Sequence, residues 1–256
     1  MPSTPHLSLV IPHYNEVERL HLMEEGLVEL AKFAAHYDIE VLLVDDGSND
    51  GTWPGLQAIA DSFESKHGTI QSDFEIRCLQ QYPNAGKGVA LQKGVKEANG
   101  KWILTLDADM ATKPIEVFNW HHDGKIDLQD HGSHIVAIGS REHPDSVVHD
   151  DSGRRFMGRM FNRITRILSG LRIKDTQCGF KLYPAGLAKE VFAELVHTGW
   201  AHDVEILKRI QKRGIPIHSL PIQWKAIEGS KVNPLTDSWK MFFALIEIRR
   251  ALKKEG

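Results

Sequence analysis

Short apolar runs alternate along the chain with longer segments in which apolar residues recur at helical spacing. Leu7 to Ile11 is an apolar run of strand length, and Leu20 to Ala34 keeps the three- and four-residue spacing of an amphipathic helix. Two further apolar runs, Ile39 to Val44 and Phe74 to Leu79, are also each followed by a segment that is expected to be helical. Strands that alternate with helices pair in parallel through right-handed crossovers. The pattern therefore predicts an α/β fold, a mostly parallel sheet with helices on both faces.

A fourth apolar run, Trp102 to Leu106, ends abruptly in Asp107, Ala108 and Asp109. Ligands of open α/β sheets bind beyond the carboxyl ends of the strands, so we expect both carboxylates in a crevice. Side chains two residues apart in extended chain point the same way and can converge on one hard cation, Mg²⁺ or Mn²⁺. The alternative is an ordinary polar turn, because DxD alone is common by chance.

Three further loops are expected at the same edge of the sheet. HYNE (13–16) follows the first strand and DDGSNDGT (45–52) follows the second. NAGKG (84–88) begins a helix with Lys87 in its first turn, where backbone N–H groups and a cation suit phosphate. The chain has neither a Walker spacing nor a GxGxxG fingerprint. Together the loops predict an acidic, glycine-rich nucleotide pocket.

Composition changes this picture little. The 256 residues are 41% hydrophobic and 25% charged with a formal net charge of −3, so no global field indicates nucleic acid. Cys78 and Cys178 are too few for a disulfide framework and too far apart for a zinc pattern, which fits a reducing compartment. With no apolar run of membrane-spanning length and no signal-peptide pattern, we expect a cytoplasmic protein.

Four motifs in this order resemble the inverting family 2 glycosyltransferases of GT-A fold. The motifs are IPHYNE (11–16), VDDGSNDGT (44–52), NAGKG (84–88) and DADMATK (107–113). The resemblance implies one Rossmann-like GT-A domain over residues 1–256. Its first half, to about residue 110, is expected to bind a nucleotide sugar, and about 111–256 the acceptor.

Carried over residue by residue, the resemblance assigns the nucleotide-sugar site and its metal. The implied contacts are Pro12, Tyr14, Glu16, Asp46, Lys87, Asp107, Ala108, Asp109 and Lys231. Asp107 and Asp109 take the metal and the diphosphate. Ala111 is a departure, because polyprenyl-phosphate mannose synthases often carry a glutamine there, so waters or phosphate oxygens must complete the shell.

The second half carries candidates for acceptor binding. His134 to Gly139 is expected to be a strand that delivers Arg141 to the crevice, as a phosphate ligand or in an ordinary salt bridge. Trp120 to Gly132 contains three histidines without a helical i, i+4 pair, which favours a solvated loop over a metal site. Arg154 to Lys174 has seven basic residues, no acidic one and apolar residues at helical spacing. It predicts a basic amphipathic helix on an anionic membrane surface, the alternative being a core-packed helix.

Three later features resemble the dolichyl-phosphate glucosyltransferase branch of the family. They are DTQCGFKL (175–182), Trp200 before AHDVEIL, and Trp224 ahead of IEGSK. The resemblance implies transfer of glucose from UDP-glucose to a polyprenyl phosphate, by a protein peripheral on the cytoplasmic face of a membrane. It covers nearly the whole chain, excluding the 120–132 insert and the N-terminal membrane segment of the eukaryotic members.

A phosphate acceptor sets the expected chemistry. A phosphate monoester is already anionic at neutral pH, so Asp203 and Glu205 are expected to position groups, whereas a hydroxyl acceptor would need Asp203 as base. Arg141, Arg154 and Ser230 are expected to hold the acceptor phosphate. The catalytic candidates are Asp109, Arg141 and Asp203.

Several alternatives stay open at this point. Asp175 and Gln177 are expected to shape the acceptor loop, unless Asp175 only pairs with nearby arginines. Transfer to a saccharide hydroxyl is the second candidate function. A nucleotidyltransferase would be expected to carry a basic, glycine-rich loop after the first strand, and a non-enzymatic nucleotide-sugar sensor would tolerate loss of the metal carboxylates.

Overall fold

The computed structural model describes residues 4–34, 36–67, 74–130, 134–150, 165–167, 169–199, 201–227 and 244–250. The strands of this part are β1 (Leu7–His13), β2 (Ile39–Asp46), β3 (Phe74–Gln81), β4 (Trp102–Thr105), β5 (Val136–Gly139), β6 (Val147–His149), β7 (Lys181–Pro184), β8 (Ile217–Leu220) and β9 (Gln223–Lys225). The helices are η1 (Val17–Arg19), α1 (Leu20–Phe33), α2 (Thr52–His67), α3 (Lys87–Glu97), α4 (Glu116–His122), α6 (Ala185–Ala193) and α7 (His202–Lys212).

The main sheet of the described residues has the strand order β3-β2-β1-β4-β7-β5-β8. β1 pairs in parallel with β2 and β4, β2 with β3, and β5 with β8. The predicted mostly parallel α/β sheet is therefore confirmed. Because these strands run the same way, the loops after β1, β2 and β4 meet at one edge of the sheet.

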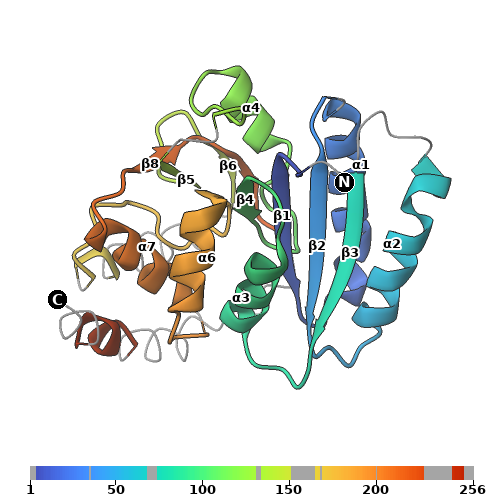
Figure 1. The fold of residues 1–256 in the computed structure, drawn as a ribbon, viewed down its shortest axis with the longest axis horizontal. Coiled ribbons are helices and arrows are strands. Elements are labelled where there is room, and N and C mark those ends of the chain that lie inside the picture. The colour runs from blue at the N-terminus through green and yellow to red at the C-terminus, as the bar shows by residue number, and fades with distance from the viewer. Residues whose placement is uncertain are drawn as a thin grey trace.

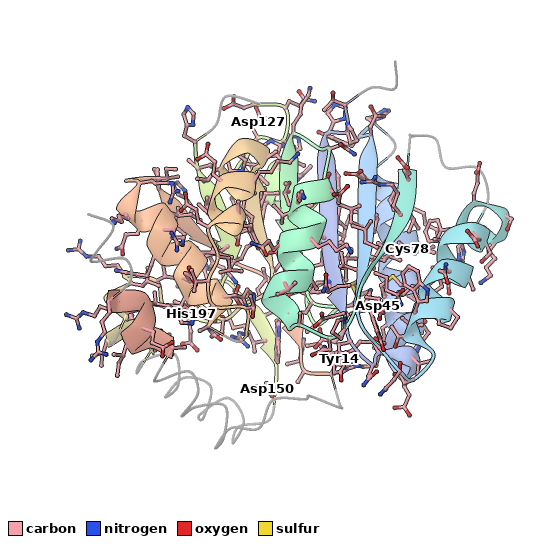
Figure 2. The ribbon with its side chains drawn as sticks, turned by 60° about the horizontal axis from the view of Figure 1, so that its bottom comes forward. Tyr14, Asp45, Cys78, Asp127, Asp150 and His197 are labelled. Atoms are coloured by element: carbon pink, nitrogen blue, oxygen red, sulfur yellow. The ribbon has the colours of Figure 1, made fainter. Side chains whose placement is uncertain are left out.

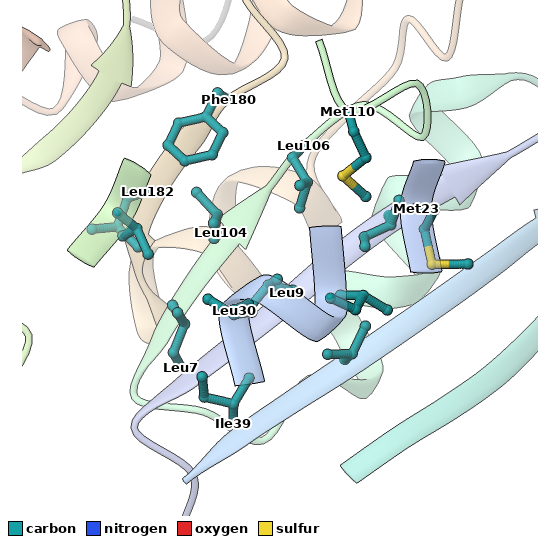
Figure 3. Close-up of a cluster of buried hydrophobic side chains, with 14 of the residues drawn as sticks. Leu7, Leu9, Met23, Leu30, Ile39, Leu104, Leu106, Met110, Phe180 and Leu182 are labelled. Carbon is teal, nitrogen blue, oxygen red and sulfur yellow. The ribbon is translucent and has the colours of Figure 1, made fainter. Parts of the chain in front are cut away.

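Alternation along the strands sends side chains into two apolar cores, one on each face of the sheet. Leu9 of β1 faces the core formed with α1, α2 and α4, whereas its neighbour Val10 faces the core formed with α3, α6 and α7. Figure 1 shows α3, α6 and α7 together on one side of the sheet. In Figure 3, Leu9 and Leu104 lie with Leu30 of α1 in the first of these cores.

β7 is the exception in the sheet, because it lies antiparallel between β4 and β5. Its first residue, Lys181, pairs with Thr105, the last residue of β4. An antiparallel strand begins at the edge where its parallel neighbours end. The segment just before β7 therefore lies at the edge that carries Asp107 and Asp109.

A small second sheet brings one more segment to this edge. β6 and β9 pair in parallel, and the Lys225 N–H donates to the carbonyl of Ala111 at 2.9 Å. This bond connects β9 to the loop that follows the two aspartates. Trp224, the middle residue of β9, is thereby placed beside that loop.

Two predictions for the second half of the chain need correction. The helix expected to reach Lys174 ends at Gly170 in the described residues, where φ is +67°, and Leu171 and Ile173 are buried in the α7 core instead. Residues 154–164 and 168 lie outside the described residues. The segment expected to be a solvated loop begins inside α4, and its Trp120 is buried and donates its indole N–H to the Pro221 carbonyl at 2.7 Å. No helix in the described ranges is both long and apolar enough to cross a membrane.

Candidate active site

The loops after β1 and β2 are joined by hydrogen bonds at the edge of the sheet. The N–H groups of Asn15 and Glu16 donate to the hydroxyls of Ser48 and Thr52 at 2.9 and 2.7 Å. Figure 2 shows Tyr14 at the same end of the sheet as Asp45. Pro12 is buried inside β1, Tyr14 is 40% exposed, and Glu16 forms an ion pair with Arg19 at 2.5 Å. These hydrogen bonds hold the first two predicted loops, 13–16 and 45–52, together, and the two loops form the rim of the site.

Asp46 holds the third loop of the site. Its carboxylate accepts hydrogen bonds from the Asn84 side chain and from the N–H groups of Ala85 and Gly86, at 2.8 to 3.0 Å. The Gly88 N–H donates to the Thr198 carbonyl at 2.8 Å. The N–H groups of Ala85, Gly86 and Gly88 are therefore used inside the protein, so these three do not serve a phosphate as the sequence interpretation expected. What this loop presents to the site is the side chain of Lys87.

Lys87 forms an ion pair with the first aspartate of the DxD motif, Asp107. Burial raises the pKa of Asp107, but the Lys87 ammonium outweighs this and lowers it below its usual value. Behind the carboxylate lies Gly179, where an added Cβ would be 2.4 to 2.6 Å from the Asp107 carboxyl atoms. Asp107 is therefore fixed by a cation on one side and by the absence of a side chain on the other.

Asp109 has the character of a cation ligand. Its carboxylate accepts one hydrogen bond within the described residues, from the Ala111 N–H at 3.0 Å. Burial and the negative charge of Asp107 raise its pKa, so the ionised form lacks a full counter-charge. Oxygen donors of this kind suit Mg²⁺ or Mn²⁺. The described residues hold no group of three or more His, Cys, Asp or Glu that could bind a metal, so a cation here would complete its shell with other oxygens.

Asp203, in the first turn of α7, forms a buried ion pair with Lys181 at 2.5 Å. Lys181 also donates to the Cys178 carbonyl at 2.5 Å. Burial raises the pKa of Asp203, but His202, Lys181 and Lys87 outweigh this and lower it to about 2. A carboxylate with so low a pKa is a weak proton acceptor at neutral pH.

Arg141 is held from two sides. Its backbone N–H, Nε and Nη2 donate to the fully buried carboxylate of Asp175 at 2.7 to 3.0 Å, and its guanidinium carbon lies 5.5 Å from the centre of the Trp224 ring. The salt bridge considered from the sequence is therefore present. It uses Nε and Nη2, while Nη1 donates to no residue in the part of the chain that the structure describes.

The structure brings most of the predicted site together. Lys87 lies close enough to Asp107, Asp109 and Asp203 for their charges to raise its pKa above the usual value, although burial opposes this. Three candidates, Arg154, Ser230 and Lys231, fall outside the described residues. The sequence interpretation missed Gly179 and Lys181, although both stand in the DTQCGFKL motif.

We expect Gly179→Ala to displace Asp107 and to weaken binding of Mn²⁺ and UDP more than tenfold, because the new methyl group overlaps the carboxylate. Calorimetric titration measures both affinities. Gly186→Ala is the matched control, because nothing lies within 4 Å of its added Cβ. Unchanged affinities in a folded Gly179→Ala variant would contradict this placement of Asp107.

Solved structures with the same fold include one that holds Mn²⁺ and UDP. Glucosyl-3-phosphoglycerate synthase from Mycobacterium tuberculosis, in complex with Mn²⁺, UDP and glucosyl-3-phosphoglycerate, matches with a TM-score of 0.62 at 17% identity, over 94% of this chain and 78% of that chain. Mannosyl-3-phosphoglycerate synthase from Rubrobacter xylanophilus matches with a TM-score of 0.61 at 19% identity, over 98% and 75%. At these identities the likeness establishes the fold.

Sequence comparisons establish the family. Dolichyl-phosphate beta-glucosyltransferases are 38% identical in Mus musculus, over 96% of this chain and 75% of the relative, and 35% identical in Dictyostelium discoideum, over 95% and 74%. The relative from Saccharomyces cerevisiae is 34% identical over 96% and 74%. The family model described as glycosyl transferase family 2 matches residues 8–192. This chain belongs to glycosyl transferase family 2.

Proposed function

We propose that this glycosyltransferase moves glucose from UDP-glucose to a dolichyl or other polyprenyl phosphate, with inversion at the sugar carbon. The relatives named above carry this acceptor and this sugar in their names. The observation that carries the proposal is the pairing of a fixed cation, Arg141, with a carboxylate, Asp203, that is locked in an ion pair. Such a site suits an acceptor that arrives already ionised.

The proposed binding of the sugar donor rests on Asp107 and Asp109, at the edge of the sheet where β4 ends. Asp109, with Asp107 beside it, would hold Mg²⁺ or Mn²⁺, which supplies charge neutralisation for the leaving diphosphate when bound. Tyr14 and Glu16 on the rim, with Pro12 and Asp46 behind them, are proposed to receive the nucleoside. Lys231 is proposed as a further cation for the diphosphate.

The acceptor half rests on Arg141. Asp175 and Trp224 fix its guanidinium, so its Nη1 edge, which donates to none of the described residues, is oriented before a ligand arrives. An oriented guanidinium binds phosphate oxygens and loses little entropy when it does so. Arg154 and Ser230 are proposed to complete this phosphate site.

No general base is required for a phosphate acceptor, because the attacking oxygen is ionised at neutral pH. Asp203 then acts as a positioning residue, which keeps Lys181 and the start of β7 in place. A saccharide hydroxyl would instead need a base whose pKa lies near neutrality. The low pKa of Asp203 therefore favours the phosphate acceptor.

We expect the protein to transfer radiolabelled glucose from UDP-glucose into an organic-soluble polyprenyl product. Replacing Arg141 should lower the rate by about 30- to 1,000-fold, on the order of 2 to 4 kcal/mol, without weakening UDP binding. Because Arg141→Met alone would leave buried Asp175 unpaired, it is combined with Asp175→Asn, and Asp175→Asn alone is the control. Efficient labelling of a soluble sugar but not of the lipid would refute the acceptor assignment.

The rate should depend on the protonation of the acceptor and not on that of Asp203. A phosphate monoester loses its second proton near pH 6, so kcat/KM should rise with pH up to about 6 and then level off. Asp203, with a pKa of about 2, stays ionised across pH 5 to 9 and adds no inflection. Profiles of wild type and of Lys181→Met/Asp203→Asn, which removes both charges of the pair, should share the same inflection. A rise that disappears in the double variant would identify Asp203 as a base.

We also propose that the basic segment 154–174 docks the enzyme on the cytoplasmic face of an anionic membrane. In its described part Ile167 is 68% exposed beside Arg166, which supports docking at this point of the segment, whereas Leu171 and Ile173 are buried. At about 1 kcal/mol per basic residue near the surface, three contacts would give measurable binding. Co-sedimentation with phosphatidylserine vesicles should fall as salt is raised, and Arg159→Glu/Arg163→Glu should abolish it. Equal binding to neutral vesicles would count against docking by charge.

A further inference from the structure

A small pocket lies beside Arg141 and Asp107, the first aspartate of the DxD motif. It is lined by Leu106, Asp107, Ala111, Thr112, Arg141, Gln177, Cys178, Gly179, Phe180 and Trp224. Its volume is about 280 Å³ when the adjoining open space is counted, and a water-sized group can be centred in about 30 Å³ of it. The pocket therefore admits a small polar group such as a hydroxyl.

Two neutral polar side chains of this pocket have buried atoms with no hydrogen-bond partner. Thr112 is 93% buried, being 7% exposed, and its Oγ1 is unpartnered within the described residues. The same holds for Nε2 of Gln177 on the opposite segment, just before β7. A buried polar atom without a partner destabilises the folded protein, so such a pair indicates a ligand that supplies the missing bonds.

We infer that Thr112 and Gln177 bind a hydroxyl group of the donor sugar and thereby help select the sugar that is transferred. The inference rests on the proposed function, in which the sugar must lie between the leaving diphosphate and the incoming phosphate. The pocket suits that position, because its lining includes both Asp107, which is proposed to hold the metal of the diphosphate, and Arg141, which is proposed to hold the acceptor phosphate. A hydroxyl both donates and accepts, so it can satisfy a threonine oxygen and an amide nitrogen together.

The character of the lining favours a sugar over a phosphate. Thr112 and Gln177 carry no charge, so neither can form an ion pair with a phosphate. Trp224 is half-buried and offers ring surface against which the C–H groups of a sugar can pack, whereas Leu106 and Phe180 line the pocket but are buried. A phosphate is better served by the guanidinium of Arg141.

The test compares binding of UDP with binding of UDP-glucose in the presence of Mn²⁺, by calorimetry. Thr112→Val and Gln177→Leu should each weaken UDP-glucose by about 2- to 10-fold and leave UDP unchanged, because each variant loses one hydrogen bond. Thr176→Val is the matched control. Thr176 is 1% exposed and its Oγ1 is likewise unpartnered in the described residues, but it is not among the residues that line the pocket.

A panel of UDP-deoxyglucose donors then identifies the hydroxyl. The analogue that lacks the bound group should bind wild type and Thr112→Val equally, whereas the other analogues keep the difference between the two proteins. Unchanged UDP-glucose affinity in Thr112→Val and Gln177→Leu would overturn the inference and leave the pocket with a structural water. A raised KM for polyprenyl phosphate with normal donor affinity would also overturn it, by assigning the pocket to the acceptor.

These outcomes are distinguishable from failure of the proposed function. If wild type binds UDP-glucose and glucosylates the lipid while the variants match it, only the inference fails. If wild type binds no UDP-glucose in any arm, the proposed donor fails and the inference falls with it.

Discussion

The structure depends on the neutralisation of carboxylates that the fold gathers at one edge of its sheet. Strand ends deliver Asp46, Asp107 and Asp109 to this edge, and the first turn of α7 adds Asp203. Carboxylates so close together in a partly buried site repel one another unless each has a partner. Asp46 is satisfied by backbone N–H groups, Asp107 by Lys87, and Asp203 by Lys181. Asp109 is the one of the four that has, among the described residues, no ion pair and a single hydrogen-bond donor, and this leaves it suited to bind a metal ion.

β7 is the element that makes this arrangement possible. A strand parallel to β4 would begin at the opposite edge of the sheet and bring Cys178, Gly179 and Lys181 far from the aspartates. The antiparallel direction of β7 places them against Asp107 and Asp203. The requirement for close approach explains the glycine, and the requirement for a counter-charge explains a lysine that is completely buried. One short strand therefore serves both the packing and the electrostatics of the site.

The sequence predicted the first half of the fold well, because apolar runs of strand length and helical spacing are local signals. It also placed Asp107, Asp109 and Lys87 at one edge, since parallel strands end together. It did not reveal pairs such as Arg141 with Asp175, which are 34 residues apart and meet only through the tertiary fold.

The sequence pattern was also misinterpreted where its signal did not match the local structure, as where helical spacing of apolar residues continues past the end of the helix. Leu171 extends the helical spacing of the preceding residues, but Gly170 adopts a positive φ and ends the helix before it. Leu171 and Ile173 then fit the two-residue alternation of extended chain and are both buried. Trp120 stands in a polar stretch, and only the Pro221 carbonyl, 101 residues away, shows why its indole can be buried.

The separation of charged and neutral groups in the pocket follows from the reaction proposed for it. A phosphate acceptor must approach a sugar that is still attached to a diphosphate, so negative charges face each other across one sugar ring. At about 6 Å and an effective dielectric constant of about 20, each pair of unit charges repels by about 3 kcal/mol. Lys87, which pairs with Asp107, and Arg141, the proposed ligand of the acceptor, offset this repulsion. Thr112 and Gln177 line the same pocket as Asp107 and Arg141 and carry no charge, so they can distinguish sugars without attracting either phosphate into the space that the sugar must occupy.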